Sequence, residues 1–208
     1  MQFHIGATPL NNTYQKYMQI EHTAIPGVEL IHPAIFGDSR GYFFESWNQR
    51  DFDAAVRPVR FCQDNESRST YGVVRGLHFQ TGEYSQSKLV RVLEGRVLDV
   101  AVDIRVGSPT FGKWVAVELS GENHLQMFIP RGFAHGFSVL SPTALFQYKC
   151  DRLYDPAHEA AIAWDDPDLG IDWRIPAAGV LLSERDRNHP RLHDCKCLFD
   201  YSKNLYEI

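Results

Sequence analysis

The sequence of 208 residues has few cysteines and lacks a long apolar run. Its four cysteines, Cys62, Cys150, Cys195 and Cys197, show no C-x-x-C spacing and are too few for a disulfide scaffold, so free thiols are expected. The "CKC" pair would give a structural zinc ion only two of its four ligands. The first residues lack the apolar core of a signal peptide, and nowhere do enough apolar residues follow one another to span a bilayer. These absences predict a cytoplasmic protein without a membrane segment.

Clusters of basic residues are also missing. The formal net charge is −5, and lysines and arginines are scattered along the chain. Nucleic-acid binding needs a concentrated basic surface, so this class of function is excluded. Any anionic ligand must be held by individually placed cations. The length and the ordinary globular composition predict one domain over residues 1–208.

Short apolar segments separated by turn residues fill most of the chain. They include "VELIHPAIF", "GVVRGLHF", "KLVRVLEG", "KWVAVELS" and "ALFQYKC", and this pattern is typical of an all-β sandwich or barrel. Helical signal is scarce. The best candidate begins at Asn48, a good N-cap, and would place Phe52, Ala55 and Val56 on one face. From about Pro167 onward the sequence predicts an extended segment that wraps the β body.

The strand "VLDVAVDIR" alternates in a way that separates two faces. Leu98, Val100, Val102 and Ile104 share one face, which is predicted to be core, whereas Asp99 and Asp103 lie on the other. A solvated sheet face would explain the two carboxylates. A polar site would explain them equally well.

The stretch "RGLHFQ" places the polar residues Arg75, His78 and Gln80 in a predicted strand. Together with Glu83 and His135, His78 could form a metal site, since histidines on the strands of a small β-barrel are ligands in metal-binding cupins. However, Gln80 stands where a metal-binding H-x-H motif would have its second histidine. The sequence therefore favours a site without metal.

His78 is then better interpreted as a general base. An imidazole titrates near neutral pH, and a carboxylate on its second nitrogen would fix its tautomer. Asp186, Asp103 and Asp99 are all candidates for this partner, and the residues alone do not choose among them. Tyr148 could serve as a protonated acid, and Lys88 could stabilise negative charge on a carbonyl oxygen.

Seven motifs in order resemble the dTDP-4-dehydrorhamnose 3,5-epimerase family. They run from about Ile25 to Pro190: "FGDSRGYFFES", "QDNESRS", "GVVRGLHFQ", "SKLVRVLEGRVLDVAVDIRVGSPTFGKW", "FIPRGFAHGFSVLS", "YKCDRLY" and "IAWDDPDLGIDW". The resemblance implies an all-β, cupin-like jelly roll with a few short helices. It also implies a homodimer without cofactor or metal, which converts dTDP-4-dehydro-6-deoxy-D-glucose to dTDP-4-dehydro-L-rhamnose in dTDP-rhamnose biosynthesis. Residues 1–24 would then be an N-terminal extension and residues 187–208 a C-terminal tail.

The resemblance also implies roles for individual residues. His78 would remove the sugar protons with Asp186 as its partner, Tyr148 would reprotonate from the opposite face, and Lys88 would lie near the carbonyl oxygen. The substrate pocket would be lined by Gln63, Asn65, Arg75 and His135. Arg40, Phe43 and Glu45 would reach the pocket of the partner subunit.

Two alternatives remain at this point. A single-position epimerase (C3 or C5) or a 3,4-ketoisomerase of a related deoxysugar pathway would share the histidine base. A sugar-nucleotide-binding β domain without catalytic activity would keep the arginines and aromatic residues but would need no matched base and acid. The presence of both His78 and Tyr148 favours an inverting epimerase.

Overall fold

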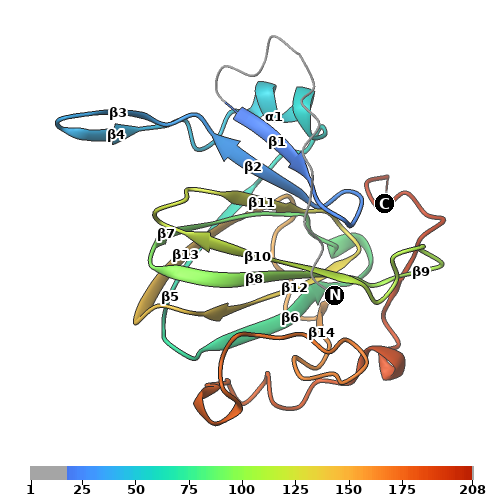
Figure 1. The fold of residues 1–208 in the computed structure, drawn as a ribbon. Coiled ribbons are helices and arrows are strands. Elements are labelled where there is room, and N and C mark those ends of the chain that lie inside the picture. Colours follow the sequence, from blue (N-terminus) through green and yellow to red (C-terminus); the bar gives the residue numbers. More distant parts are fainter. Residues whose placement is uncertain (1–17, 208) are drawn as a thin grey trace.

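The computed structural model describes residues 18–207. Two large antiparallel sheets pack face to face, as Figure 1 shows. The first sheet has six strands in the order β1-β2-β11-β7-β13-β5. Their bounds are β1 Met18–His22, β2 Glu29–Pro33, β5 Gln63–Thr70, β7 Lys88–Glu94, β11 Gln126–Ile129 and β13 Thr143–Cys150. The expected all-β architecture is confirmed.

The second large sheet has five strands in the order β10-β8-β12-β6-β14. Its strands are β6 Val74–Gln80, β8 Arg96–Asp103, β10 Trp114–Ser120, β12 Phe133–Val139 and β14 Glu159–Ala161. Two small sheets pair β3 Phe36–Asp38 with β4 Gly41–Phe43, and β9 Arg105–Val106 with β15 Phe199–Asp200. The helices are short: α1 Gln49–Ala55 and the 3₁₀ turns η1 Gly82–Tyr84, η2 Ala177–Gly179 and η3 Leu192–Asp194.

Within residues 18–207, none of the helices has the length and apolarity needed to cross a bilayer. Of the N-terminal extension expected over residues 1–24, residues 1–17 lie outside the described part of the chain.

The core between the two sheets is apolar and draws on both of them. Val90, Met127 and Phe146 from the six-stranded sheet meet Val97 and Phe137 from the five-stranded sheet, and all five are buried. Burying a side chain of this size contributes about 1.5–3 kcal/mol. This core closes the middle of the sandwich.

The outer face of the five-stranded sheet is covered as well. Leu98 and Val100 of β8 pack against Trp173, Leu192 and neighbouring apolar residues of the C-terminal segment, which runs along the lower side of the sheet in Figure 1. Both faces of β8 are therefore buried, and neither is solvated. The alternation itself was predicted, but the face that carries Asp99 turns toward the space between the sheets.

Helix α1 begins where the sequence predicts. The Asn48 side chain accepts a hydrogen bond from the Asp51 backbone N–H at 3.2 Å. Phe52 is buried and Val56 packs beside it against the outer face of the six-stranded sheet. Ala55 is exposed, contrary to the prediction, because the helix ends at this residue and is too short to bury a full stripe.

A hairpin formed by β3 and β4 projects from the body of the molecule (Figure 1). Its aromatic side chains are unusually open: Tyr42 is 62% exposed and Phe43 is 70% exposed. A soluble monomer rarely presents such a group of large apolar side chains without a partner. The hairpin is thus a candidate contact surface.

Two glycines allow β6 and β12 to approach closely beside His78. A Cβ atom on Gly136 would lie 2.6 Å from the Arg75 carbonyl oxygen, and one on Gly76 would lie 2.5 Å from the Gly136 Cα. Gly76 also has a φ of +133°, which L side chains rarely adopt. The register between the strands is irregular here, and His135 is the partner of His78. The two histidines are thereby held side by side.

We expect Gly136→Ala to destabilise the protein by about 1–3 kcal/mol, because the added methyl group meets backbone that cannot rotate away. Urea unfolding followed by circular dichroism measures this change. Gly37→Ala is the matched control, since its Cβ would find its nearest neighbour at 3.7 Å. Equal unfolding midpoints for Gly136→Ala and the unsubstituted protein would contradict the argument.

Candidate active site

A cavity of about 300 Å³ opens between the two sheets at one end of the sandwich. Five residues proposed from the sequence line it: Gln63, Asn65, His78, Lys88 and Tyr148. His78 comes from β6 of the five-stranded sheet, whereas Lys88 and Tyr148 come from β7 and β13 of the six-stranded sheet. The cavity therefore has a histidine on one wall and a tyrosine with a lysine on the facing wall.

Asp186 is the carboxylate that pairs with His78. Its Oδ1 lies 2.6 Å from His78 Nε2, although the two residues are 108 positions apart. Ser183 Oγ donates to Asp186 Oδ2 at 2.6 Å. Burial alone would raise the pKa of Asp186, but the hydrogen bonds from His78 and Ser183 outweigh it and lower the pKa to about 2. This carboxylate is ionised at neutral pH.

The other two candidate aspartates have different partners. Asp99 is fully buried and lies 3.0 Å from His135 Nε2. Asp103 is also fully buried and accepts hydrogen bonds from Arg105, Ser108 and nearby Thr110 in the turn after β8. Of the three alternatives left open by the sequence, the structure brings only Asp186 to His78.

His135 lies behind the cavity, next to His78. It is 6% exposed and is not among the residues that line the cavity. Burial lowers its pKa most strongly; Asp99 opposes this shift, while Lys88 and His78 add to it. The ring is consequently neutral at neutral pH. His135 and Asp99 are buried behind the cavity, and their charges couple to that of Lys88, which lines it.

Lys88 and Tyr148 have pKa values shifted by their burial. Desolvation lowers the pKa of Lys88, and the nearby thiol of Cys150 and the carboxylate of Asp99 only partly oppose it. Desolvation raises the pKa of Tyr148 to about 12. The Lys88 Nζ lies 5.9 Å from the centre of the Tyr148 ring. The phenol is thus protonated at neutral pH.

The remaining predicted pocket residues surround this group. Gln63 Nε2 donates to Asn65 Oδ1 at 2.9 Å, and the Gln63 Oε1 accepts from the Tyr154 backbone N–H at 2.9 Å. Arg75 is exposed, and its guanidinium donates to Ser69 Oγ at 3.2 Å. Its charge lowers the pKa of Tyr148, although less than burial raises it.

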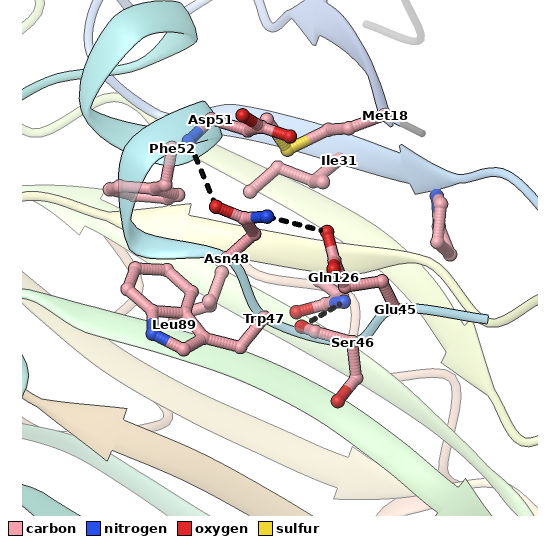
Figure 2. A pocket seen from close by; sticks show the side chains of 11 residues that line it. Met18, Ile31, Glu45, Ser46, Trp47, Asn48, Asp51, Phe52, Leu89 and Gln126 are labelled. Carbon is pink, nitrogen blue, oxygen red and sulfur yellow. Dashed lines mark hydrogen bonds between the residues drawn. The ribbon is translucent and has the colours of Figure 1, made fainter. Parts of the chain in front are cut away.

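Three predicted residues lie away from this cavity in the same chain. Arg40 and Phe43 are on the projecting hairpin, where Arg40 pairs with Asp38 at 2.6 Å. Glu45 lines a smaller pocket beneath α1, and Figure 2 shows its carboxylate accepting a hydrogen bond from Asn48 at 2.9 Å. A single subunit does not bring these residues to His78.

The metal set considered from the sequence is not assembled. Glu83 is exposed in η1 outside the cavity, and His135 is engaged by Asp99. The structure instead places His78, Asp186 and His189 together, with one possible ligand atom from each within 4.8 Å of the others.

Several cavity residues were missed by the sequence analysis. They are Phe79, Gln80, Gln86, Cys150, Tyr154 and Glu159. Alternation along β6 and β13 could have found Gln80 and Cys150, which stand two residues from His78 and Tyr148. Tyr154 and Glu159, which share a hydrogen bond of 2.9 Å, come from a loop and a short strand without such a signal.

Known proteins resemble this chain over most of its length. The family model described as dTDP-4-dehydrorhamnose 3,5-epimerase matches residues 22–194. The dTDP-4-dehydrorhamnose 3,5-epimerase of Pseudomonas aeruginosa is 55% identical over 181 residues, covering 86% of this chain and 99% of the relative. The Escherichia coli enzyme of the same name is 52% identical over 170 residues, covering 81% and 91%.

Solved structures agree with this assignment. A dTDP-6-deoxy-D-glucose-3,5-epimerase from Legionella pneumophila, crystallised with dTDP-4-keto-L-rhamnose, has a TM-score of 0.86 and 49% identity, covering 89% of this chain and 99% of its own. The dTDP-4-dehydrorhamnose 3,5-epimerase of Elizabethkingia anophelis has a TM-score of 0.83 and 50% identity, covering 87% and 99%. The fold is accordingly a cupin-like jelly roll, and the chain belongs to the dTDP-4-dehydrorhamnose 3,5-epimerase family.

Proposed function

We propose that the protein is an isomerase that converts dTDP-4-dehydro-6-deoxy-D-glucose to dTDP-4-dehydro-L-rhamnose by inverting C3 and C5. The observation that carries this proposal is the placement of His78 and Tyr148 on facing walls of one cavity. Inversion needs a base on one face of the sugar and an acid on the other. Similarity to relatives with this activity supports the choice of substrate.

In this proposal His78 is the base. The ionised carboxylate of Asp186 accepts a hydrogen bond from the Nε2–H of His78, which leaves the lone pair on Nδ1. Nδ1 takes a proton from the carbon next to the C4 ketone, and the electron pair of the C–H bond moves onto the ketone oxygen. Asp186 also stabilises the imidazolium that forms.

Lys88 stabilises the enolate formed in this step. Its ammonium group supplies a positive charge in a site of low polarity, where such a charge is worth more than in water. Neutral His135 lies next to it and contributes a ring that is fixed by Asp99. Lys88 is the group assigned to the developing oxygen charge, and His135 lies behind the cavity without lining it.

Tyr148 completes the inversion by donating its proton to the enolate carbon on the opposite face. Its raised pKa keeps the proton in place until the enolate forms. The tyrosinate and the imidazolium then exchange protons with solvent, which restores both groups. The same cycle acts at C3 and at C5 because both carbons adjoin the ketone, and no electrons are gained or lost overall.

The substrate's pyrophosphate requires local cations, since the chain as a whole carries a net charge of −5. Arg75 is exposed close to Tyr148 and is assigned to the anionic end of the substrate together with Arg40. Gln63 and Asn65 provide further hydrogen bonds. A cytoplasmic location remains a prediction from the sequence.

Arg40 can serve this role only from a second subunit. Arg40 and exposed Phe43 belong to the hairpin of β3 and β4, which projects from the body in Figure 1, and neither residue lines the cavity of its own chain. We therefore propose a homodimer in which the region of Arg40, Phe43 and Glu45 completes the site of the partner. The exposed aromatic residues of the hairpin supply the apolar area for this contact.

Proton NMR of the substrate in D₂O separates the two catalytic roles. Unsubstituted protein, with a chelator present, should introduce deuterium at C3 and C5 and form inverted product. His78→Asn should lose both exchange and inversion, by about 10²–10⁴-fold. Tyr148→Phe should still exchange deuterium, because the base remains, but should form little inverted product.

The same spectra test the alternatives. Exchange at one carbon alone would indicate a single-position epimerase, as in the 3'-monoepimerase from Streptomyces bikiniensis, whose structure is 32% identical to this chain. Binding without exchange at either carbon would indicate a module that only binds sugar nucleotides. Turnover of His78→Asn near the unsubstituted level would contradict the role of His78.

The alkaline limb of the pH profile should belong to Lys88. Burial lowers the pKa of Lys88 below its usual value but raises that of Tyr148 to about 12, so the ammonium is lost before the phenol ionises as pH rises. Lys88→Arg should move the alkaline limb of kcat to higher pH, since arginine stays protonated. Values of kcat measured at pH values from about 7 to 11 would show this shift. An alkaline limb at the same pH in Lys88→Arg and the unsubstituted protein would refute the assignment.

Mixing two inactive variants tests the shared site. His78→Asn and Arg40→Ala subunits should each be poorly active alone, whereas a heterodimer has one site with both native residues. Random mixing should restore about a quarter of the full activity, because half of the dimers are mixed and each has one intact site. Activity that stays at the sum of the separate variants would show that Arg40 acts in its own chain or not at all.

A further inference from the structure

His189 is a histidine beside the proposed base that the mechanism does not use. Its ring meets the His78 ring edge to face, with centroids 5.9 Å apart and an angle of 86° between the planes. Its Nε2 is buried and has no hydrogen-bond partner. The same atom lies 3.8 Å from Asp186 Oδ1, beyond hydrogen-bond distance. A buried imidazole nitrogen without a partner needs an explanation.

The three side chains offer the ligands that a transition metal prefers. His78 Nε2 is 2.6 Å from Asp186 Oδ1, His189 Nε2 is 3.8 Å from it, and all three atoms lie within 4.8 Å of one another. In a tetrahedral zinc site with bonds of about 2.0–2.1 Å, ligand atoms are about 3.3 Å apart. The two measured separations bracket this value, so small side-chain movements would complete the site.

The cluster lies behind the part of the cavity wall that His78 forms. Asp186 and His189 are not among the residues that line the cavity. The side chains of His78 and His189 are 34% and 21% exposed, respectively. The fourth coordination position would be left for water.

We propose that His78, Asp186 and His189 form an inhibitory site for Zn²⁺ or a similar divalent transition metal. Metal binding does not depend on the proposed function, whereas inhibition depends on the proposed role of His78 as base. Coordination through Nε2 requires the lone pair on that nitrogen, so the ring proton moves to Nδ1. His78 then has no lone pair toward the substrate, and the metal also displaces the hydrogen bond to Asp186.

This arrangement predicts a specific form of inhibition. Zn²⁺ should lower kcat with little change in KM, since the metal sits behind the base and leaves the substrate cavity open. His189→Gln should need at least about tenfold more Zn²⁺ for the same inhibition, because one of three protein ligands is lost. With a chelator present, the same variant should turn over substrate within a few fold of the unsubstituted protein.

Binding is measured separately from activity. Co²⁺ in place of Zn²⁺ should give the visible absorption of a tetrahedral site in the chelator-stripped protein, and this signal should be lost in His189→Gln. His193→Gln is the matched control, because His193 lies 3.2 Å from Asp194 in an exposed pair outside the cluster. Cys197→Ser controls for the thiols of Cys195 and Cys197, whose sulfur atoms are 3.5 Å apart.

The outcomes distinguish the two proposals. Loss of the Co²⁺ signal in His189→Gln alone, without epimerase activity in any sample, would support the metal site and refute the proposed function. An equal Zn²⁺ response of the unsubstituted protein and His189→Gln would overturn the metal site, as would a Co²⁺ signal that depends on Cys197. Absence of any Zn²⁺ or Co²⁺ binding would overturn it as well.

Discussion

The hydrogen bond between Asp186 and His78 is the interaction on which the site depends. It joins the C-terminal segment to β6 across 108 positions of sequence. Asp186 is held in turn by Ser183 and stays ionised, so it can fix the histidine tautomer at any ordinary pH. The segment that carries it must therefore be docked before His78 can act as the proposed base.

Docking of that segment is an apolar packing problem. Trp173 and Leu192 are buried against the outer face of the five-stranded sheet, and each contributes about 1.5–3 kcal/mol. The Trp173 indole N–H also donates to the Trp164 carbonyl at 2.8 Å. The outer layer thus supports the candidate active site, although it lies on the far side of the sheet from the cavity.

The sequence predicted the sheets and much of the site because both follow local patterns. Alternation identified β8, and the polar side chains of His78 and Tyr148 stood out in otherwise apolar strands. The sequence pattern did not predict that both faces of β8 are buried, since this depends on where the distant C-terminal segment docks. Choosing Asp186 over Asp99 required either that same long-range contact or the family resemblance.

Other differences have equally physical causes. The position of Arg40 depends on how a hairpin leaves the body, which no periodicity encodes. Glu159 enters the cavity through the pairing of β14 with β6, a contact between segments about 80 residues apart. His189 lies close to His78 because it follows Asp186 in the same loop, and Asp186 is hydrogen-bonded to His78. The sequence indicated which side chains could carry chemistry. Which of them lie together depends on tertiary contacts, which the sequence pattern does not show.

The residues after 194, where the family match ends, also connect to the site. The Tyr206 ring lies 3.5 Å from the Arg57 guanidinium, and its hydroxyl lies 2.6 Å from Ser87 Oγ. Asp151 accepts from the Ser87 backbone N–H at 2.6 Å and from buried Arg131 at 3.0 Å. Ser87 immediately precedes Lys88. The tail therefore completes a polar network around the start of β7, where Lys88 enters the cavity. These contacts hold the strand that carries Lys88, as the hydrogen bond to Asp186 holds the proposed base.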